Sequence, residues 1–280
     1  MAVSASRIFA AGLLDGHVAV ITGGGTGLGR AAAAELIACG ASVVICGRRA
    51  EVLEEAAAAL GPACVPVVAD IRDPADARRV VDVATGRFGR LDLLVNNAGG
   101  QYFTPAETIA SKGWNAVWRL NVGGTRTMTA AAVDGAMRSA RRGMVVNVTL
   151  SPHHGLPGMT HSSAARAAVE GLTREWAAEF ASFGVNVCAV AAGHFETDAI
   201  RKYPDSVRNN AARTVPLQRL GEEREHAWLI GLLASPLGRA FNGSVVTLDG
   251  ARDNWYGPWP PEELKERGEV PTEARRPSVP

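Results

Sequence analysis

One glycine-rich stretch has the residue types and spacing of a phosphate-binding turn. The run from Thr22 to Gly29 follows an apolar segment at 18–21, typical of a buried strand, and precedes a segment at 30–38 rich in helix-forming residues. Glycines allow a tight turn and a close approach of the backbone to a pyrophosphate, and the next helix offers its N-terminal N–H groups. The pattern predicts a dinucleotide site, and the alternative is a turn with a purely structural role. The expected contacts come from Thr22, Gly23, Gly25, Thr26, Gly27, Leu28 and Gly29.

Two arginines at the end of the second predicted strand suggest which dinucleotide binds. The segment at 42–46 is apolar and is followed by Gly47, Arg48 and Arg49. A carboxylate at this position would accept hydrogen bonds from the adenosine ribose, but none is present. Arginine suits a 2′-phosphate through its charge and its forked donors. Arg48 and Arg49 therefore favour NADP(H) over NAD(H), the alternative being that they are solvated residues leading into the next helix.

The elements that must position these residues alternate regularly along the chain. Segments that are apolar on both faces predict strands, and the segments between them predict helices. Asp73 followed by Pro74 is a helix start, because aspartate caps the N-terminus and proline fits the first turn. The pattern is typical of an α/β fold with a doubly wound parallel sheet covered on both faces. The predicted strands lie at 18–21, 42–46, 65–69, 91–95, 144–148, 185–190 and 244–248.

Composition narrows the class of protein. The 280 residues are 47% hydrophobic and 20% charged, with a net charge of +1, which gives no general reason to expect nucleic-acid binding. No apolar run approaches the roughly 18–20 residues of a membrane span, and no signal peptide is recognisable. The scattered cysteines predict reduced, buried thiols and a cytoplasmic protein without a metal site. These cysteines are Cys39, Cys46, Cys64 and Cys188.

The chain divides into one domain and two flanking segments. We expect an N-terminal segment at 1–13, a dinucleotide-binding catalytic domain at 14–251 and a proline-rich, aromatic tail at 252–280. The tail is expected to be extended and to pack, through its aromatic residues, on its own or a neighbouring subunit.

Three motifs together resemble the short-chain dehydrogenase/reductase family. They are the glycine turn, the run from Asn96 to Gly99, and Leu120-Asn121-Val122. The resemblance covers about 14–250 and implies a single-domain Rossmann fold with a seven-stranded parallel sheet, a nicotinamide cofactor and a homotetramer or homodimer. It also implies that Asn121 kinks its helix and holds a proton-relay water. Further cofactor contacts implied by the family are Asp70, Ile71, Asn97, Ala98, Gly99, Gly193 and Thr197.

The sequence departs from the family where the reaction takes place. The family pattern is a serine after the fifth strand and then Tyr-x-x-x-Lys, in which the tyrosine moves a proton and the lysine lowers the pKa of the tyrosine. Alignment on Ala-Ala-Val-x-x-Leu-Thr instead puts Ser162 at the tyrosine position, Arg166 at the lysine position and Thr149 near the serine position. Positions 162 and 166 share one helix face. Because a serine hydroxyl does not ionise near neutral pH and arginine stays protonated, the usual relay is absent.

A smaller group in the family shows the same departure. The sequence is similar to the peroxisomal trans-2-enoyl-CoA reductases and the 2,4-dienoyl-CoA reductases in Gly12-Leu13-Leu14, in the run from Asn96 to Gln101, in Ser111-Lys112-Gly113-Trp114 and in the run from His161 to Arg166. The resemblance implies NADPH and the reduction of the C2=C3 double bond of a 2-enoyl thioester.

Conjugate reduction explains the loss of the tyrosine. Hydride adds to C3, and the charge develops on the thioester oxygen, which needs hydrogen-bond donors more than a strong acid. We expect donors from Ser162, from Thr149 or Ser151, and from Gln101, while Arg166 holds the nicotinamide ribose. The C2 proton comes from water or from an acid, and His161, Tyr102 and His153 are unranked candidates for that acid.

Cations that follow the sixth predicted strand could bind the phosphates of a CoA carrier. The alternative is a solvated surface, since Glu222, Glu223 and Glu225 follow directly. The cations concerned are Arg201, Lys202, Arg208, Arg213 and Arg219, and Tyr203 lies in the same segment.

Two further hypotheses stay open. One is ordinary alcohol or carbonyl chemistry in which Tyr102 or a histidine replaces the missing tyrosine. The other is an NADP(H)-binding sensor or assembly module without turnover.

Overall fold

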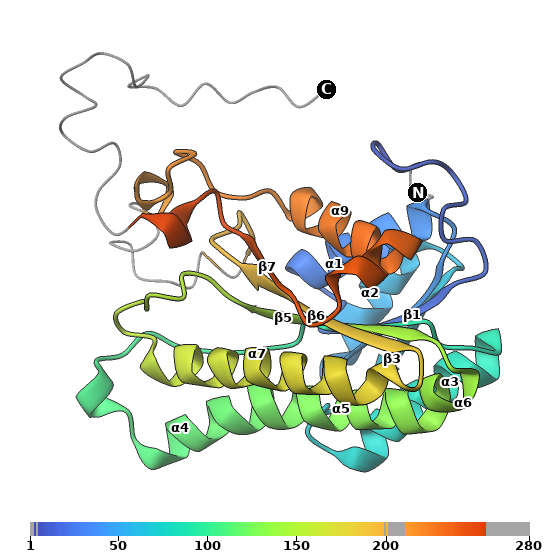
Figure 1. Ribbon diagram of the computed structural model, residues 1–280, viewed down its shortest axis with the longest axis horizontal. Helices are drawn as coiled ribbons and strands as arrows, with labels where there is room; N and C mark the ends of the chain where they lie inside the picture. Colours follow the sequence, from blue (N-terminus) through green and yellow to red (C-terminus); the bar gives the residue numbers. More distant parts are fainter. Residues whose placement is uncertain (1–2, 4, 199, 201–210, 256–280) are drawn as a thin grey trace.

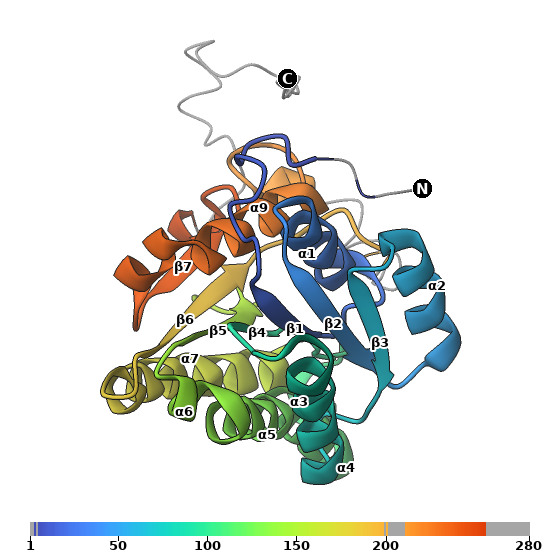
Figure 2. The ribbon, with the colours of Figure 1, turned by 90° about the vertical axis from the view of Figure 1, so that its right-hand side faces the viewer.

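The fold is built on one parallel sheet. The computed structural model describes residues 3, 5–198, 200 and 211–255. The sheet lies between layers of helices (Figure 1). The strands are ordered β3-β2-β1-β4-β5-β6-β7 and all pair in parallel (Figure 2). This confirms the single-domain, doubly wound seven-stranded Rossmann fold. The strands are β1 (Val18–Thr22), β2 (Ser42–Gly47), β3 (Cys64–Val68), β4 (Leu93–Asn96), β5 (Gly143–Leu150), β6 (Val185–Ala192) and β7 (Val245–Leu248).

Helices cover both faces of the sheet (Figure 2). One face packs against α1 (Gly27–Ala38), α2 (Ala50–Leu60) and α9 (Glu223–Ala234). The other packs against α3 (Pro74–Phe88), α5 (Thr125–Ala132) and α7 (Thr160–Ala181). Shorter elements are α4 (Ser111–Trp118), α6 (Arg138–Ala140), π-helical segments at Arg119–Gly124 and Val133–Met137, and 3₁₀ turns at Ala106–Thr108, Ala212–Thr214, Pro236–Phe241 and Arg252–Asn254.

The strands are buried because helices lie on both sides of them. Every residue of β1 is buried, and Ile21 and Val20 point into the two separate apolar clusters. Parallel strands buried on both faces need such continuous apolar runs, which is what the sequence pattern predicted.

The helix start predicted at Asp73 and Pro74 is present in the structure. The Asp73 carboxylate accepts a hydrogen bond from the Ala75 N–H at 2.8 Å, and Pro74 occupies the first turn of α3. This confirms the predicted helix start.

The strand order creates a crevice at the carboxyl edge of the sheet. The chain moves outward from β1 to β3 and then crosses back to place β4 on the other side of β1. Loops from β1 and β4 therefore diverge at this point, which is where ligands bind in open α/β sheets.

Candidate active site

The turn after β1 is shaped so that backbone, and not side chains, faces the crevice. Gly23 has φ +67°, a conformation that favours glycine. A Cβ on Gly29 would lie 2.5 Å from the Gly23 carbonyl oxygen, so only glycine lets the start of α1 pack this closely on the turn. The first turn of α1 carries no acidic residue. This arrangement fits an anionic pyrophosphate against the helix N-terminus.

Thr22 braces the turn and does not line the cavity. Its buried hydroxyl accepts hydrogen bonds from the N–H groups of Asn97 (3.0 Å) and Ala98 (2.9 Å). The Asn97 side chain returns a hydrogen bond to the Thr22 carbonyl at 2.8 Å. These contacts tie the turn after β1 to the loop after β4.

A cavity of about 1020 Å³ opens along the carboxyl edge of the sheet. It brings together most of the predicted site residues, which come from the segments after β1, β2, β3, β4 and β6, from the end of β5 and from α7. The lining includes Gly23, Gly25, Thr26, Gly27, Leu28, Gly29, Arg48, Arg49, Asp70, Ile71, Asn97, Ala98, Gly99, Gln101, Thr149, Arg166, Gly193 and Thr197.

One end of the cavity is charged. Arg48 and Arg49 are exposed where β2 ends, and Asp70 and Ile71 follow β3. Hydrogen bonds from the Arg72 guanidinium hold the pKa of Asp70 at about 2, so this carboxylate is ionised at neutral pH and already paired. The two arginines are the cationic groups at this rim.

A stripe on α7 faces the ends of β4 and β5. Ser162 is fully buried, and its Oγ lies 3.5 Å from Oε1 of Gln101, at the long limit of a hydrogen bond. One turn later, Nη1 of Arg166 donates to the Val148 carbonyl oxygen at 2.6 Å. One turn further on, Glu170 faces Thr149. The spacing of four residues places all three on one face of the helix.

Arg166 passes directly over Gly99. A Cβ on Gly99 would lie 2.0 Å from Nη2 of Arg166 and 2.7 Å from Oδ1 of Asn121. Glycine at 99 therefore leaves the space in which the guanidinium reaches the cavity wall.

Asn121 lies beneath the loop after β4 and outside the cavity lining. Its side-chain nitrogen donates to the carbonyl oxygens of Gly100 and Val117, each at 2.9 Å, and its Oδ1 accepts from the Gly100 N–H at 3.2 Å. The surrounding Arg119–Gly124 segment is π-helical, a local departure from α-helical hydrogen bonding. The side chain therefore braces the loop that carries Gly99 and Gln101.

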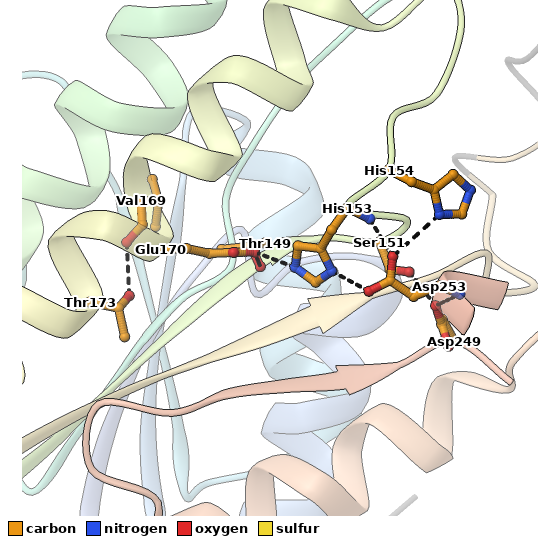
Figure 3. A network of polar contacts seen from close by, with 9 residues as sticks. All are labelled: Thr149, Ser151, His153, His154, Val169, Glu170, Thr173, Asp249 and Asp253. Carbon is orange, nitrogen blue, oxygen red and sulfur yellow. Dashed lines mark hydrogen bonds and ion pairs between the residues drawn. The ribbon is translucent and has the colours of Figure 1, made fainter. Parts of the chain in front are cut away.

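The two hydroxyls on and after β5 both bind carboxylates. Thr149 lines the cavity and donates to Oε1 of Glu170 at 2.9 Å, while the buried Ser151 donates to Asp249 (Figure 3). Ser151 does not line the cavity, so the structure separates it from Gln101 and Thr149, with which the sequence grouped it.

The three candidate acids differ in their surroundings. His161 is 1% exposed, burial lowers its pKa, and its ring packs edge-on against Tyr102 with centroids 4.4 Å apart. The Tyr102 ring lines the cavity, but its hydroxyl lies against Gly113 of α4, where a Cβ would be only 2.1 Å away. His153 instead joins the hydrogen-bonded network of Glu170.

Sequence reasoning missed Glu170 and the apolar wall. Glu170 continues the four-residue spacing of Ser162 and Arg166, so one more helical turn would have identified it. The apolar wall has no periodic signal, because its members come from separate loops and helices. These side chains are Phe103, Leu120, Leu150, Leu156, Met159 and Ile200.

Only part of the predicted phosphate-binding segment can be placed. Arg201, Lys202, Tyr203 and Arg208 lie outside the described residues. Arg219 pairs in a forked manner with Glu225, at 2.8 and 2.6 Å, which favours a structural role for this arginine. Most of the predicted tail, from residue 256 onward, also lies outside the described residues.

The described part of the chain contains neither a candidate membrane span nor a candidate metal site. No helix there has the length and apolar character that a bilayer span requires. No group of three histidine, cysteine or acidic side chains in the same residues is arranged to hold a metal ion. All four cysteines are buried and unlinked.

Known proteins share both the sequence pattern and the fold. Residues 17–207 match the family model described as short chain dehydrogenase. A probable 2,4-dienoyl-CoA reductase of Bacillus subtilis is 34% identical over 257 residues, covering 88% of this chain and 100% of the relative. A 3-oxoacyl-[acyl-carrier-protein] reductase of Thermotoga maritima is 34% identical over 241 residues, covering 85% and 98%. Structurally, the citronellol catabolism dehydrogenase AtuB of Pseudomonas aeruginosa aligns with a TM-score of 0.79 and 36% identity, over 88% of this chain and 98% of that one.

These matches confirm the resemblance inferred from the motifs, including the similarity to dienoyl-CoA reductases. The family model covers the strands from β1 to β6, the glycine turn and α7. The chain belongs to the short-chain dehydrogenase/reductase family.

Proposed function

We propose that this protein is an NADP(H)-dependent reductase of the C2=C3 double bond of 2-enoyl thioesters. The glycine turn and the N-terminus of α1 would hold the pyrophosphate, and Arg48 with Arg49 would hold the 2′-phosphate. Thr197, Gly193 and Arg166 also line the cavity, and they would hold the nicotinamide and its ribose. Bound there, the cofactor supplies a hydride.

The observation that carries the proposal is the character of α7 at the cavity. The helix brings Arg166, at the lysine position of the family pattern, to the cavity wall, while Ser162, at the tyrosine position, is fully buried and outside the lining. The helix contains no tyrosine, the ionisable phenol that carbonyl reduction needs. Conjugate addition of hydride develops charge on the thioester oxygen, for which hydrogen-bond donors suffice. Gln101 and Arg166 carry such donors at the cavity wall.

The remaining wall suits an acyl chain. Phe103, Leu156, Met159 and Ile200 line the same cavity as Gln101 and contribute apolar surface. Apolar walls with a few polar groups are typical of sites that orient one polar function of a largely apolar ligand. The name of the Bacillus subtilis relative, a probable 2,4-dienoyl-CoA reductase, favours a conjugated acyl thioester in the same position.

A spectrophotometric assay tests the proposal. Purified protein is mixed with NADPH and crotonyl-CoA or 2,4-hexadienoyl-CoA, and absorbance loss is compared with that on a panel of ketones and, with NADP⁺, of alcohols. Turnover of the thioesters supports the proposal, and turnover of ketones or alcohols alone would refute it.

Alcohol or carbonyl chemistry is the second candidate function. Tyr102 places a phenol ring at the cavity wall. The Pseudomonas and Thermotoga proteins are named as a citronellol catabolism dehydrogenase and a 3-oxoacyl reductase. In this case Tyr102→Phe abolishes turnover of ketones. Under the leading proposal, Tyr102→Phe leaves reduction of crotonyl-CoA within about threefold of wild type.

The same assay addresses the non-catalytic hypothesis. NADPH binding with no turnover of any acceptor would support a sensor or assembly module. We also propose that the protein prefers NADP(H) to NAD(H), forms a homotetramer or homodimer, and is located in the cytoplasm.

A further inference from the structure

Glu170 is a buried carboxylate next to the cavity whose partners can all exchange protons. The residue is only 6% exposed and lies in the middle of α7. Its Oε1 atom contacts Thr149 Oγ1 at 2.9 Å and His153 Nε2 at 2.9 Å (Figure 3). Since Thr149 lines the cavity, the carboxylate lies between the cavity wall and the imidazole.

His153 connects this carboxylate to the surface. Its side chain is 36% exposed, and its other ring nitrogen, Nδ1, contacts the Asp253 carboxylate of the Arg252–Asn254 turn. His154 lies 3.6 Å from the same carboxylate. Burial alone would lower the pKa of His153, but hydrogen bonds to Asp253 and Glu170 raise it above its ordinary value. The groups that face the ring are thus Glu170 from α7 and Asp253 from the turn.

The single hydroxyl proton of Thr149 limits the hydrogen bonds that this residue can donate. A threonine hydroxyl has one proton, and here that proton is donated to Glu170. Toward the cavity Thr149 therefore presents lone pairs while Glu170 is ionised. If Glu170 takes up a proton, it can donate to Thr149, and the Thr149 proton becomes available to the cavity. The charge of the carboxylate thus decides whether Thr149 acts as an acceptor or a donor, which the sequence could not show.

We infer that His153, Glu170 and Thr149 form a path along which the proton consumed by the reduction enters the cavity. The inference rests on the proposed function. Addition of hydride to C3 leaves an enolate, and C2 takes the Thr149 hydroxyl proton as Thr149 takes a proton from Glu170 Oε1. Glu170 receives that proton from Nε2 of the His153 imidazolium, and neutral His153 regains one from water. One proton is consumed, and nothing but the hydride donor is oxidised.

The path assigns distinct roles to its members. Thr149 is the catalytic residue, because it alone of the three lines the cavity. Glu170 and His153 act through it. Asp253 orients the ring of His153. Neither these residues nor others in the described ranges form a group of three that could hold a metal ion.

Paired variants test the path. Glu170→Gln keeps the shape and an acceptor for Thr149 but cannot carry a proton as a carboxylate does, so we expect kcat with crotonyl-CoA to fall about 10²-fold. His153→Gln should have a similar effect, while the dissociation constant of NADPH stays the same. Glu175→Gln, on the exposed face of the same helix, is the matched control and should behave as wild type.

The pH profile separates proton transfer from structural support. His153 must be protonated to start the sequence, so wild-type kcat falls as pH rises through the raised pKa of His153. Glu170→Gln breaks the path, so its residual kcat should no longer fall with the titration of His153, and the descending limb should return in Glu170→Asp. Loss of the Glu170 carboxylate should also lower the pKa of His153, which NMR titration of the ring measures in protein without substrate.

The outcomes distinguish this inference from the proposed function. A wild-type kcat and pH profile in both glutamine variants, together with an unchanged His153 titration in Glu170→Gln, would overturn the path alone. A wild-type protein that turns over no acceptor would overturn the proposed function and the path with it. If Glu170→Gln does not fold, His153→Gln decides, because its side chain is partly exposed.

Discussion

Two buried carboxylates occupy opposite edges of the same sheet and have opposite kinds of partner. Asp92 precedes β4 at the amino edge and is 8% exposed, whereas Glu170 contacts β5 near the carboxyl edge and is 6% exposed. Asp92 accepts two hydrogen bonds from Arg90 at 2.7 Å, one from Arg142 at 3.2 Å and one from the Val18 N–H at 3.0 Å. Glu170 meets a hydroxyl and an imidazole.

The partners determine what each carboxylate can do. Arginine keeps its proton at any physiological pH, so Asp92 is held as an anion at neutral pH and joins β1, β4 and β5. Histidine and threonine can pass a proton on, so the environment of Glu170 can change its charge during a reaction. The amino edge is therefore built for stability and the carboxyl edge for chemistry.

The largest effect on folding is expected at the amino edge. Asp92→Ala leaves the buried Val18 N–H without its acceptor and removes the partner of two arginines, so the free energy of unfolding should fall by about 3 kcal/mol. Chemical denaturation measures this, and kcat of the folded variant should match wild type. Glu170→Gln should change stability by less than about 1 kcal/mol. If Glu170→Gln lowered the free energy of unfolding as much as Asp92→Ala does, the contrast between the two edges of the sheet would be wrong.

The pH dependence of that stability has a defined sign. Burial would raise the pKa of Asp92, but hydrogen bonds from Arg90 and Val18 outweigh it and lower the pKa below its ordinary value. The stabilisation is thus fully present above the unfolded pKa of about 3.9 and is lost as pH falls through the folded value. Unfolding free energies of wild type and Asp92→Ala should converge in acid. A difference that persists unchanged to low pH would contradict the electrostatic account.

At the carboxyl edge, a single methyl group should impair the site. In Gly99→Ala the new Cβ would overlap Nη2 of Arg166, so the guanidinium must move, and NADPH should bind about 10-fold more weakly. Isothermal calorimetry measures the change. Gly86→Ala in α3 adds the same methyl where nothing lies within 4 Å, and should not alter binding. Equal affinities in the two variants would place Arg166 outside the cofactor site.

A smaller effect is expected at the charged rim. Arg48→Ala should reduce the preference for NADPH over NADH roughly 10-fold, because it removes one charge-assisted contact to the 2′-phosphate. Arg78→Ala, an exposed arginine of α3, is the control. Binding of both dinucleotides is measured by fluorescence, and an unchanged preference in Arg48→Ala would refute the role of that residue.

Much of the fold was predictable because its signals are local. The glycine turn, the Asp73 cap and the buried strands depend on residues close together in the chain. Arg48 and Gly99 could be placed at the cavity because parallel strands bring their carboxyl ends to one edge.

The direction of each hydroxyl could not be predicted. Ser151 and Thr149 are two residues apart and look equivalent in the sequence, but one binds Asp249 and the other Glu170. These contacts span 98 and 21 residues, and the sequence carries no local pattern for them. The three-residue turn that brings Asp253 to His153 begins the segment predicted to be an extended tail.

The position of hydride transfer tests the central claim most directly. Wild-type protein is incubated with crotonyl-CoA and NADPH deuterated at C4 of the nicotinamide, on either face in separate samples, and the product is analysed by NMR and mass spectrometry. The account predicts one deuterium at C3 of butyryl-CoA from one of the two samples. No deuterium in butyryl-CoA from either sample, while parallel samples with a ketone in place of crotonyl-CoA carry deuterium on the carbinol carbon, would contradict it.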